Sequence, residues 1–253
     1  MAARGIGERG AMTANRWKAD RGTAFYAIMA GVAALAAAAG FSTTYLMPLA
    51  GARFDGPWIA HVHGILFFAW VLLFVAQTSL VRRGNVQLHR RLGLCALPLA
   101  LAMALSGVGV GLYAVRRDLA AGQGDFAHSQ LIGVLTTMTI LVAFVAVALW
   151  KRRQPDWHKR MILLATIAML WPAWFRFRHF MPWVPRPDIL LAVVLADSLI
   201  VVAMIRDRLR FGQVHPAYWI FGLGLIAEHV GEILLFDTPP WRAAAGAIYA
   251  AIG

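Results

Sequence analysis

Four histidines lie at matching places in two successive parts of the chain, and histidine is a common ligand of haem iron and of transition metals. His63 opens one apolar run and His89 opens the next. His128 and His158 open the two runs that follow. Two basic residues come directly after His89 and again after His158. This spacing indicates a tandem repeat of a helical hairpin.

The repeat predicts that the histidines meet in two pairs, one near each face of a membrane. The helices opened by His63 and His128 run parallel to each other, as do those opened by His89 and His158, so each pair could share one ligand. Two imidazoles on facing helices can bind haem iron, and the basic residues after the second pair could hold the haem propionates. A divalent metal without haem and plain interfacial helix ends are the alternatives for these side chains.

A polar stripe follows His63 along its helix. Steps of seven residues lead from His63 to Trp70 and then to Gln77, which puts all three on one side of a helix that is otherwise apolar. We therefore expect this side to face protein, and the Trp70 indole N–H to find a hydrogen-bond partner inside the bundle. His61 is about 200° away from His63 around the helix, so it should face a loop or the lipid interface.

A second polar group occurs in the C-terminal third of the chain. Asp197 lies near the middle of an apolar run, Glu228, His229 and Glu232 lie in the next, and Arg176 is near the end of an earlier one. Ionisable residues at membrane depth are costly and point to function. They could relay protons or bind a hard metal, or Asp197 and Arg176 could form a structural ion pair. The candidate metal ligands are His63, His128, His229 and Glu232.

Composition requires that these residues be positioned by membrane-spanning helices. Hydrophobic residues make up 60% of the chain and charged residues only 14%. A helix needs about 20 apolar residues to cross a bilayer. The predicted fold is therefore an all-α membrane protein with one seven-helix domain over 23–253, in which the repeat units cover about 58–115 and 127–180. The expected spans are Ala24–Met47, Trp58–Val81, Leu92–Val115, Ser129–Trp150, Met161–Phe177, Ile189–Ile205 and Ala217–Phe236.

Two of these spans and the last apolar run differ from the rest in length. The fifth and sixth spans are short, so we expect their helices to extend a few residues further. The run Ala243–Ile252 is too short to cross a bilayer, and it follows the turn-forming residues 237–240. It should lie on the outer surface and pack sideways on the bundle.

Basic residues predict the orientation of the chain. With the N-terminus inside, 17 of the 24 Lys and Arg residues fall on the cytoplasmic side, as the positive-inside rule requires. Residues 1–22 are then a cytoplasmic tail, and the C-terminus lies outside a bacterial inner membrane. The net charge of +12 reflects this pattern, so a nucleic-acid partner is not expected. Cys95 is the one cysteine, which excludes an intrachain disulfide.

Short motifs around the inner histidines resemble a known group of sequences. Leu88-His89-Arg90-Arg91-Leu92-Gly93, and Trp157-His158-Lys159-Arg160-Met161 followed by Trp174-Phe175-Arg176, are similar to a bacterial family of predicted integral-membrane proteins of unknown function. The resemblance implies a multi-pass topology and adds Arg176 to the motif positions. It implies no activity.

The order of histidines over 58–177 is also similar to that of the transmembrane di-haem cytochromes b, which carry one histidine on each of four consecutive helices. This resemblance makes His63 and His128 the outer axial ligands of haem b, and His89 and His158 the inner ones. It implies an electron carrier that works between quinol, or a quinone, and a redox partner.

Two other functions are consistent with the same residues. Seven spans with histidines and acids near one face resemble in outline the adiponectin-receptor and ceramidase-like hydrolases, in which zinc activates a water. The last span lacks the His-x-x-x-His pair of those enzymes. The third hypothesis is a proton-coupled transporter or sensor that uses Asp197, Glu228 and Glu232.

Overall fold

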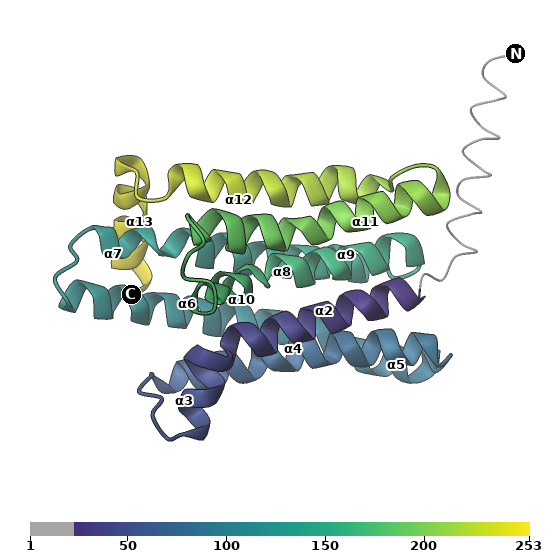
Figure 1. Cartoon of the computed structure of the whole chain (residues 1–253), viewed down its shortest axis with the longest axis horizontal. Coiled ribbons are helices and arrows are strands. Elements are labelled where there is room, and N and C mark those ends of the chain that lie inside the picture. Colours follow the sequence, from purple (N-terminus) through teal and green to yellow (C-terminus); the bar gives the residue numbers. More distant parts are fainter. Residues whose placement is uncertain (1–22) are drawn as a thin grey trace, which may run out of the picture.

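A computed structural model describes residues 23–253, which form an elongated helical bundle (Figure 1). These residues contain helices and no strand, which confirms the predicted all-α fold. The cytoplasmic tail expected for residues 1–22 lies outside the described residues.

Among the described residues, seven helices are long and apolar enough to cross a membrane, as expected of a multi-pass integral membrane protein. The fifth and sixth are longer than their apolar runs, as predicted, and the third begins six residues earlier than expected. The inner-membrane location and the orientation stay predictions. The spans are Thr23–Ala50, Trp58–Arg82, Val86–Ala120, Phe126–Trp150, Pro155–His179, Asp188–Phe211 and Tyr218–Leu235.

Several spans consist of two or three consecutive helices. The first contains α2 (Thr23–Phe41), the π-helical turn η1 (Ser42–Leu46) and α3 (Met47–Ala50). The second is α4 (Trp58–Arg82), and the third contains α5 (Val86–Gly93) and α6 (Ala96–Ala120). The fourth contains α7 (Phe126–Ser129) and α8 (Leu131–Trp150). The fifth contains α9 (Pro155–Ala168), α10 (Trp171–Phe175) and the 3-10 turn η2 (Arg176–His179).

The last two spans both begin with π-helical turns. The sixth contains η3 (Asp188–Val194) and α11 (Leu195–Phe211), and the seventh contains η4 (Tyr218–Gly222) and α12 (Leu223–Leu235). The final helix, α13 (Pro239–Ile252), follows the seventh span. Turns of the π type are frequent at functional sites, so their presence in two neighbouring spans draws attention to α11 and α12.

Local sequence explains where several helices start and stop. Pro155 occupies the first turn of α9, where its missing N–H costs no hydrogen bond. The Asn85 side chain accepts a hydrogen bond from the Leu88 N–H and so caps α5. Gly212 ends α11 in the left-handed conformation, with φ of 79°. These signals set helix ends that hydropathy alone leaves open.

α9 is the most enclosed helix, and it packs against α2, α8 and α11. α8 also packs against α6, and α6 against α4, so spans two to five form a continuous group. The contacts of α2 are made largely by small residues, among them Ala30, Ala33 and Ala37, which allow close helix approach where lipid supplies no hydrophobic drive. That spans two to five arose as a hairpin repeat stays a prediction.

A fully buried ion pair joins α9 to α11. The Arg160 Nε and Nη2 atoms donate to the two carboxylate oxygens of Asp207 at 2.8 and 2.9 Å, and both side chains are 0% exposed. Removing one partner of such a pair typically costs about 3–5 kcal/mol, because a buried charge is left behind. The pair therefore sets the position of α11 relative to α9.

α13 lies across one end of the bundle (Figure 1). Its Ala245 is buried with Val115, Ala127 and Leu131, and the Trp241 indole N–H donates to the Ser129 carbonyl at 3.1 Å. This is the sideways packing expected for the last apolar run. We call this end of the bundle the α13 end; it is the outer end in the predicted orientation.

The contact of α2 with α10 requires a glycine. A Cβ atom on Gly40 would lie 2.2 Å from the Ala173 carbonyl oxygen, whereas a Cβ on Gly31 in the same helix would meet nothing within 4 Å. We expect Gly40→Ala to lower the free energy of unfolding by about 1–3 kcal/mol, because backbone must move to relieve the clash. Gly31→Ala should be neutral or stabilising by up to about 1 kcal/mol. Thermal unfolding in detergent measures both; equal stabilities would contradict the prediction.

Candidate functional site

His229 lies between two acidic residues in the half of the bundle nearest the α13 end. Its Nδ1 is 2.9 Å from Asp197 Oδ1 on α11, and its Nε2 is 3.7 Å from Glu228 Oε2 on its own helix. His229 is 2% exposed and Asp197 7% exposed. The imidazole thus faces a carboxylate with each of its ring nitrogens.

Several atoms of this cluster are buried without a hydrogen-bond partner among the described residues. They are Asp197 Oδ2, His229 Nε2 and both carboxylate oxygens of Glu228. Buried polar atoms of this kind are rare, and each one calls for a physical reason. A proton held between neighbouring members of the cluster would satisfy such atoms, since a carboxylic acid donates where a carboxylate cannot.

Glu232 continues the cluster toward the α13 end. It lies one helical turn beyond Glu228, close enough for the charges of Glu228 and His229 to act on it. Its Oε1 accepts a hydrogen bond from the Thr136 hydroxyl on α8. By helical rise, Glu232 is about 5 Å from the last residue of α12, and Asp197 is about 14 Å from the first residue of its span. The acid–histidine cluster, defined as Asp197, Glu228, His229 and Glu232, thus reaches from near the α13 end toward mid-membrane.

The ion pair between Asp197 and Arg176, one of the alternatives that the sequence left open, does not form among the described residues. Arg176 Nε donates to Thr44 Oγ1 at 3.1 Å, its Nη1 donates to the Pro172 carbonyl at 2.7 Å, and the guanidinium lies 4.2 Å from the Phe41 ring centre. The guanidinium therefore contacts the first span, and Asp197 pairs with His229 instead. The prediction that Asp197 needs a partner was right, but the partner was wrong.

The two inner histidines meet. The ring centres of His89 and His158 are 6.3 Å apart and their planes are 84° apart. His158 Nδ1 is hydrogen-bonded to the Ala148 carbonyl at 2.8 Å, which orients its ring. His89 Nδ1 is buried and has no hydrogen-bond partner within the described part of the chain.

The two outer histidines are not brought together. His63 Nδ1 is 3.0 Å from the Ser106 hydroxyl, and a Cβ on neighbouring Gly107 would contact both His63 and Met138. His128 instead packs on the Tyr249 ring of α13, with 5.5 Å between ring centres. Since Met138 is seven residues into α8 and His128 precedes that helix, the two rings differ in depth by at least about 10 Å.

The stripe after His63 faces protein, as predicted. The Trp70 indole N–H donates to Thr166 Oγ1 at 3.2 Å, and Trp70 is 2% exposed. Gln77 Oε1 is buried without a hydrogen-bond partner among residues 23–253. His61 faces a loop, with its Nδ1 3.1 Å from the Tyr45 hydroxyl and its ring against Phe54.

The described residues contain no group of three or more His, Cys, Asp or Glu that could hold a metal ion. Of the four candidate metal ligands, His229 and Glu232 lie in the acid–histidine cluster, while His63 and His128 are elsewhere. The metal site expected from the sequence is therefore not assembled, and a zinc hydrolase has no support.

Three of the residues that matter carried little sequence signal. Asp207 lies between two arginines, Arg206 and Arg208, and looks like part of a solvated basic helix end, yet it is fully buried with Arg160. The sequence suggested that Arg160 could hold a haem propionate, but in the structure its guanidinium is bound to Asp207. Thr136 and Thr166 resemble any other threonine in an apolar span, so only the folded arrangement reveals their role.

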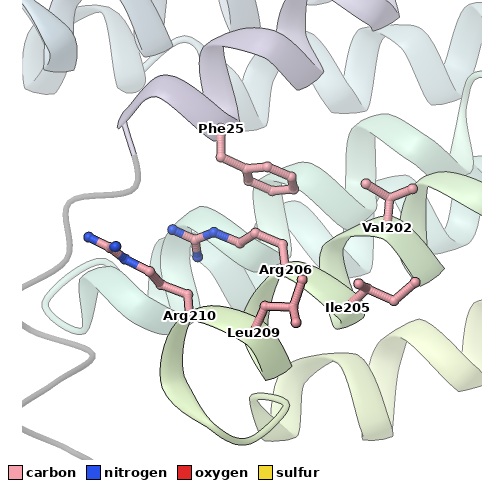
Figure 2. Close-up of a pocket in the computed structure, with 6 residues that line it drawn as sticks. All are labelled: Phe25, Val202, Ile205, Arg206, Leu209 and Arg210. Atoms are coloured by element: carbon pink, nitrogen blue, oxygen red, sulfur yellow. The ribbon is translucent and has the colours of Figure 1, made fainter.

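A shallow groove runs between α2 and α11 at the end opposite α13 (Figure 2). Phe25, Val202, Ile205 and Leu209 line it with apolar surface, and Arg206 and Arg210 lie at its edge. The apolar lining is typical of a lipid-facing helix end, while the Arg206 guanidinium is paired with Asp207 at 3.1 Å. None of the residues singled out in the sequence lines it.

Comparisons of the chain with protein-family models, curated proteins and solved structures found no match. The resemblances drawn from the sequence motifs thus stay predictions, and functional inference rests on the side chains described above.

His215, in the loop before η4, predicts a pH-dependent stability. Burial, reinforced by the positive charges of Arg160 and Lys159, lowers the pKa of His215 to about 3. The unfolded chain therefore takes up a proton on His215 near pH 6.5, whereas the folded protein takes it up only near pH 3. The contribution of His215 to the free energy of unfolding is therefore complete above pH 6.5 and is lost as the pH falls below it. We expect a loss of at most about 1.4 kcal/mol per pH unit.

Thermal unfolding of the parent and of His215→Gln between pH 5 and 7.5 tests this. The variant should show a flatter profile, while Gln213→Ala, at an exposed position in the same loop that carries no titrating group, serves as a matched control and keeps the parental slope. Identical slopes for all three proteins would contradict the prediction.

Proposed function

We propose that this protein is a proton-coupled membrane transporter in which the acid–histidine cluster takes up and releases the proton. The observation that carries the proposal is the position of His229, which bridges a carboxylate on α11 and another on α12. Ionisable groups buried at membrane depth are expensive, and proton relays are among the few functions that require them.

Imidazole is the appropriate group for such a relay. It can accept a proton at one ring nitrogen and release one at the other, and it titrates near neutral pH. In this protein Nδ1 faces Asp197 and Nε2 faces Glu228, so a proton can pass between the two acids through the ring. Glu232 then extends the path toward Thr136 and the α13 end.

Apolar side chains are packed on the other side of the cluster, away from the α13 end. Ile200 and Leu164 are each 0% exposed, and a Cβ on Gly222 would lie 3.0 Å from the Ile200 side chain and 3.7 Å from that of Leu164. Alternating access requires that such a group open to one side of the membrane at a time. The π-helical turns η3 and η4 lie in the same two spans and supply helix positions where local rearrangement is easiest.

Neutral amide variants of the cluster test the relay. With the protein in liposomes under an imposed potential and a pH-sensitive dye inside, we expect proton flux to fall at least about ten-fold in Asp197→Asn and His229→Gln, because an amide keeps the shape but cannot exchange a proton. Asp188→Asn is the matched control, since Asp188 is exposed and pairs with Arg186.

Infrared spectra recorded at two pH values provide a second readout that does not need a transported solute. The parent should show carboxylic acid bands that titrate, and Asp197→Asn should lack one of them. If Asp197→Asn matched the parent in both flux and titrating bands, the relay would be excluded.

A b-type haem electron carrier is the second candidate, favoured by the inner histidine pair. Two nitrogens bound to one metal lie about 4 Å apart, which ring centres 6.3 Å apart can accommodate. The bond from His158 to the Ala148 carbonyl is the kind that orients metal-binding histidines, and the unpartnered Nδ1 of His89 also fits a ligand role. His89 and His158 would hold the iron, with exposed Arg90 and Arg91 near the propionates; bound haem would supply one-electron transfer.

Optical spectra separate the two histidine pairs. After haem-replete expression, the parent should show a Soret band that disappears in His89→Ala and in His158→Ala. His63→Ala and His128→Ala are matched controls that should keep the band, because those rings lie at different depths. The absence of a Soret band from the purified parent would exclude haem.

A further inference from the structure

Arg176, near the α13 end of the fifth span, is a cation that pairs with no acid among residues 23–253. It is partly buried, and none of the ion pairs among the described residues includes it. The neighbouring charge that acts on it is the like charge of Arg178. Removing a charge from water is costly unless an opposite charge compensates it. The guanidinium is therefore placed where a negatively charged group is required.

The surroundings of Arg176 hold the guanidinium in one orientation. Thr44 accepts from Nε, the Pro172 carbonyl accepts from Nη1, and the Phe41 ring packs on one face of the group. Nη2 donates to no protein atom in residues 23–253, so this end of the group remains available to an acceptor. A guanidinium fixed on two sides with one donor edge open is preorganised for planar oxyanions.

The π-helical turn η1 contributes to the same place. It contains Thr44, and it also contains Thr43, whose hydroxyl is buried without a hydrogen-bond partner in the described chain. The extra residue of a π-helical turn redirects side chains at sites of function. A regular helix over 42–46 would not be expected to present these hydroxyls in the same way.

The remaining charged or titratable neighbours are basic. Arg176 lies close enough to His63 for its charge to act on that ring, and His179 is acted on by both Arg176 and Arg178. Arg178 is itself held by the Phe175 carbonyl at 3.1 Å and by the Phe175 ring. The local field is thus positive and favours an anion.

We propose that Arg176, held by Thr44 of η1, forms a binding site for an oxyanion, either a carboxylate or a phosphate group. The guanidinium edge binds the anion, and Thr44 and Phe41 hold the guanidinium in place. The site shares no residue with the acid–histidine cluster and stands without the proton relay. If the relay also operates, the oxyanion defines the chemical class of the transported solute.

Binding measurements on the full chain test the site directly. With the protein in phosphatidylcholine nanodiscs, calorimetric titration uses acetate in one arm and inorganic phosphate in a second. In a third arm, native mass spectrometry counts phosphatidylglycerol retained from mixed nanodiscs, which reports a lipid headgroup as the source of the phosphate. We expect the parent to bind in at least one arm.

Arg176→Gln should weaken that binding about 10- to 100-fold, as the loss of a charge-assisted hydrogen bond predicts. Arg176→Lys should recover part of the affinity, because lysine restores the positive charge but not the planar pair of guanidinium donors. Thr44→Val, which keeps the charge, should weaken binding by a smaller factor and covers the case in which Arg176→Gln does not fold. Arg53→Gln, an exposed arginine in the loop near the same end, is the matched control and should bind like the parent.

Two results would overturn the proposal. One is a parent that binds no probe in any of the three arms. The other is binding by folded Arg176→Gln or Thr44→Val that equals the parent's, or falls only as far as it does in Arg53→Gln. Neither result bears on proton flux, which is measured separately on Asp197→Asn.

Discussion

The buried ion pair between Arg160 and Asp207 controls how the spans that carry the polar groups are set against one another. α9 presents Thr166 to Trp70 and carries His158, while α11 presents Asp197 to His229. Both helices are held by the same bidentate contact near the end opposite α13. An ion pair in a dry interior gains little over an apolar contact, but its geometry is specific. Its structural value here is to fix the relative position of the two helices and, with it, the positions of the groups they present.

Polar chemistry in this bundle is divided between its two ends. The acid–histidine cluster, Arg176 and the outer histidines lie toward the α13 end, and the inner histidine pair lies at the other. Between them, Ile200 and Leu164 are fully buried and pack around Gly222. In the proposed transporter, this layer would keep the two polar regions from forming one continuous polar route across the membrane.

The sequence indicates that a buried polar side chain needs a hydrogen-bond partner more readily than it indicates which residue that partner is. For Trp70 the indole N–H at mid-membrane had to be bonded, and it is, although nothing in the chain singled out Thr166. For Asp197 the requirement was equally clear, but Arg176, one of the partners that the sequence offered, contacts Thr44 instead. Helical periodicity predicts which side of a helix a residue occupies, but it does not predict which helix packs against that side. Asp207 was hidden between arginines because local composition there is that of a solvated end.

The sequence by itself determined the seven spans, because a chain in lipid must satisfy its backbone hydrogen bonds within helices, and about 20 apolar residues are enough to reveal each one. It also determined that His63, Trp70 and Gln77 share one side of α4. Only the tertiary structure decided that His89 meets His158 while His63 and His128 stay apart, and that His229 bridges two acids. These pairings depend on the tilt, depth and rotation of whole helices. Such quantities are set by the packing of many side chains at once, which no single run of residues records.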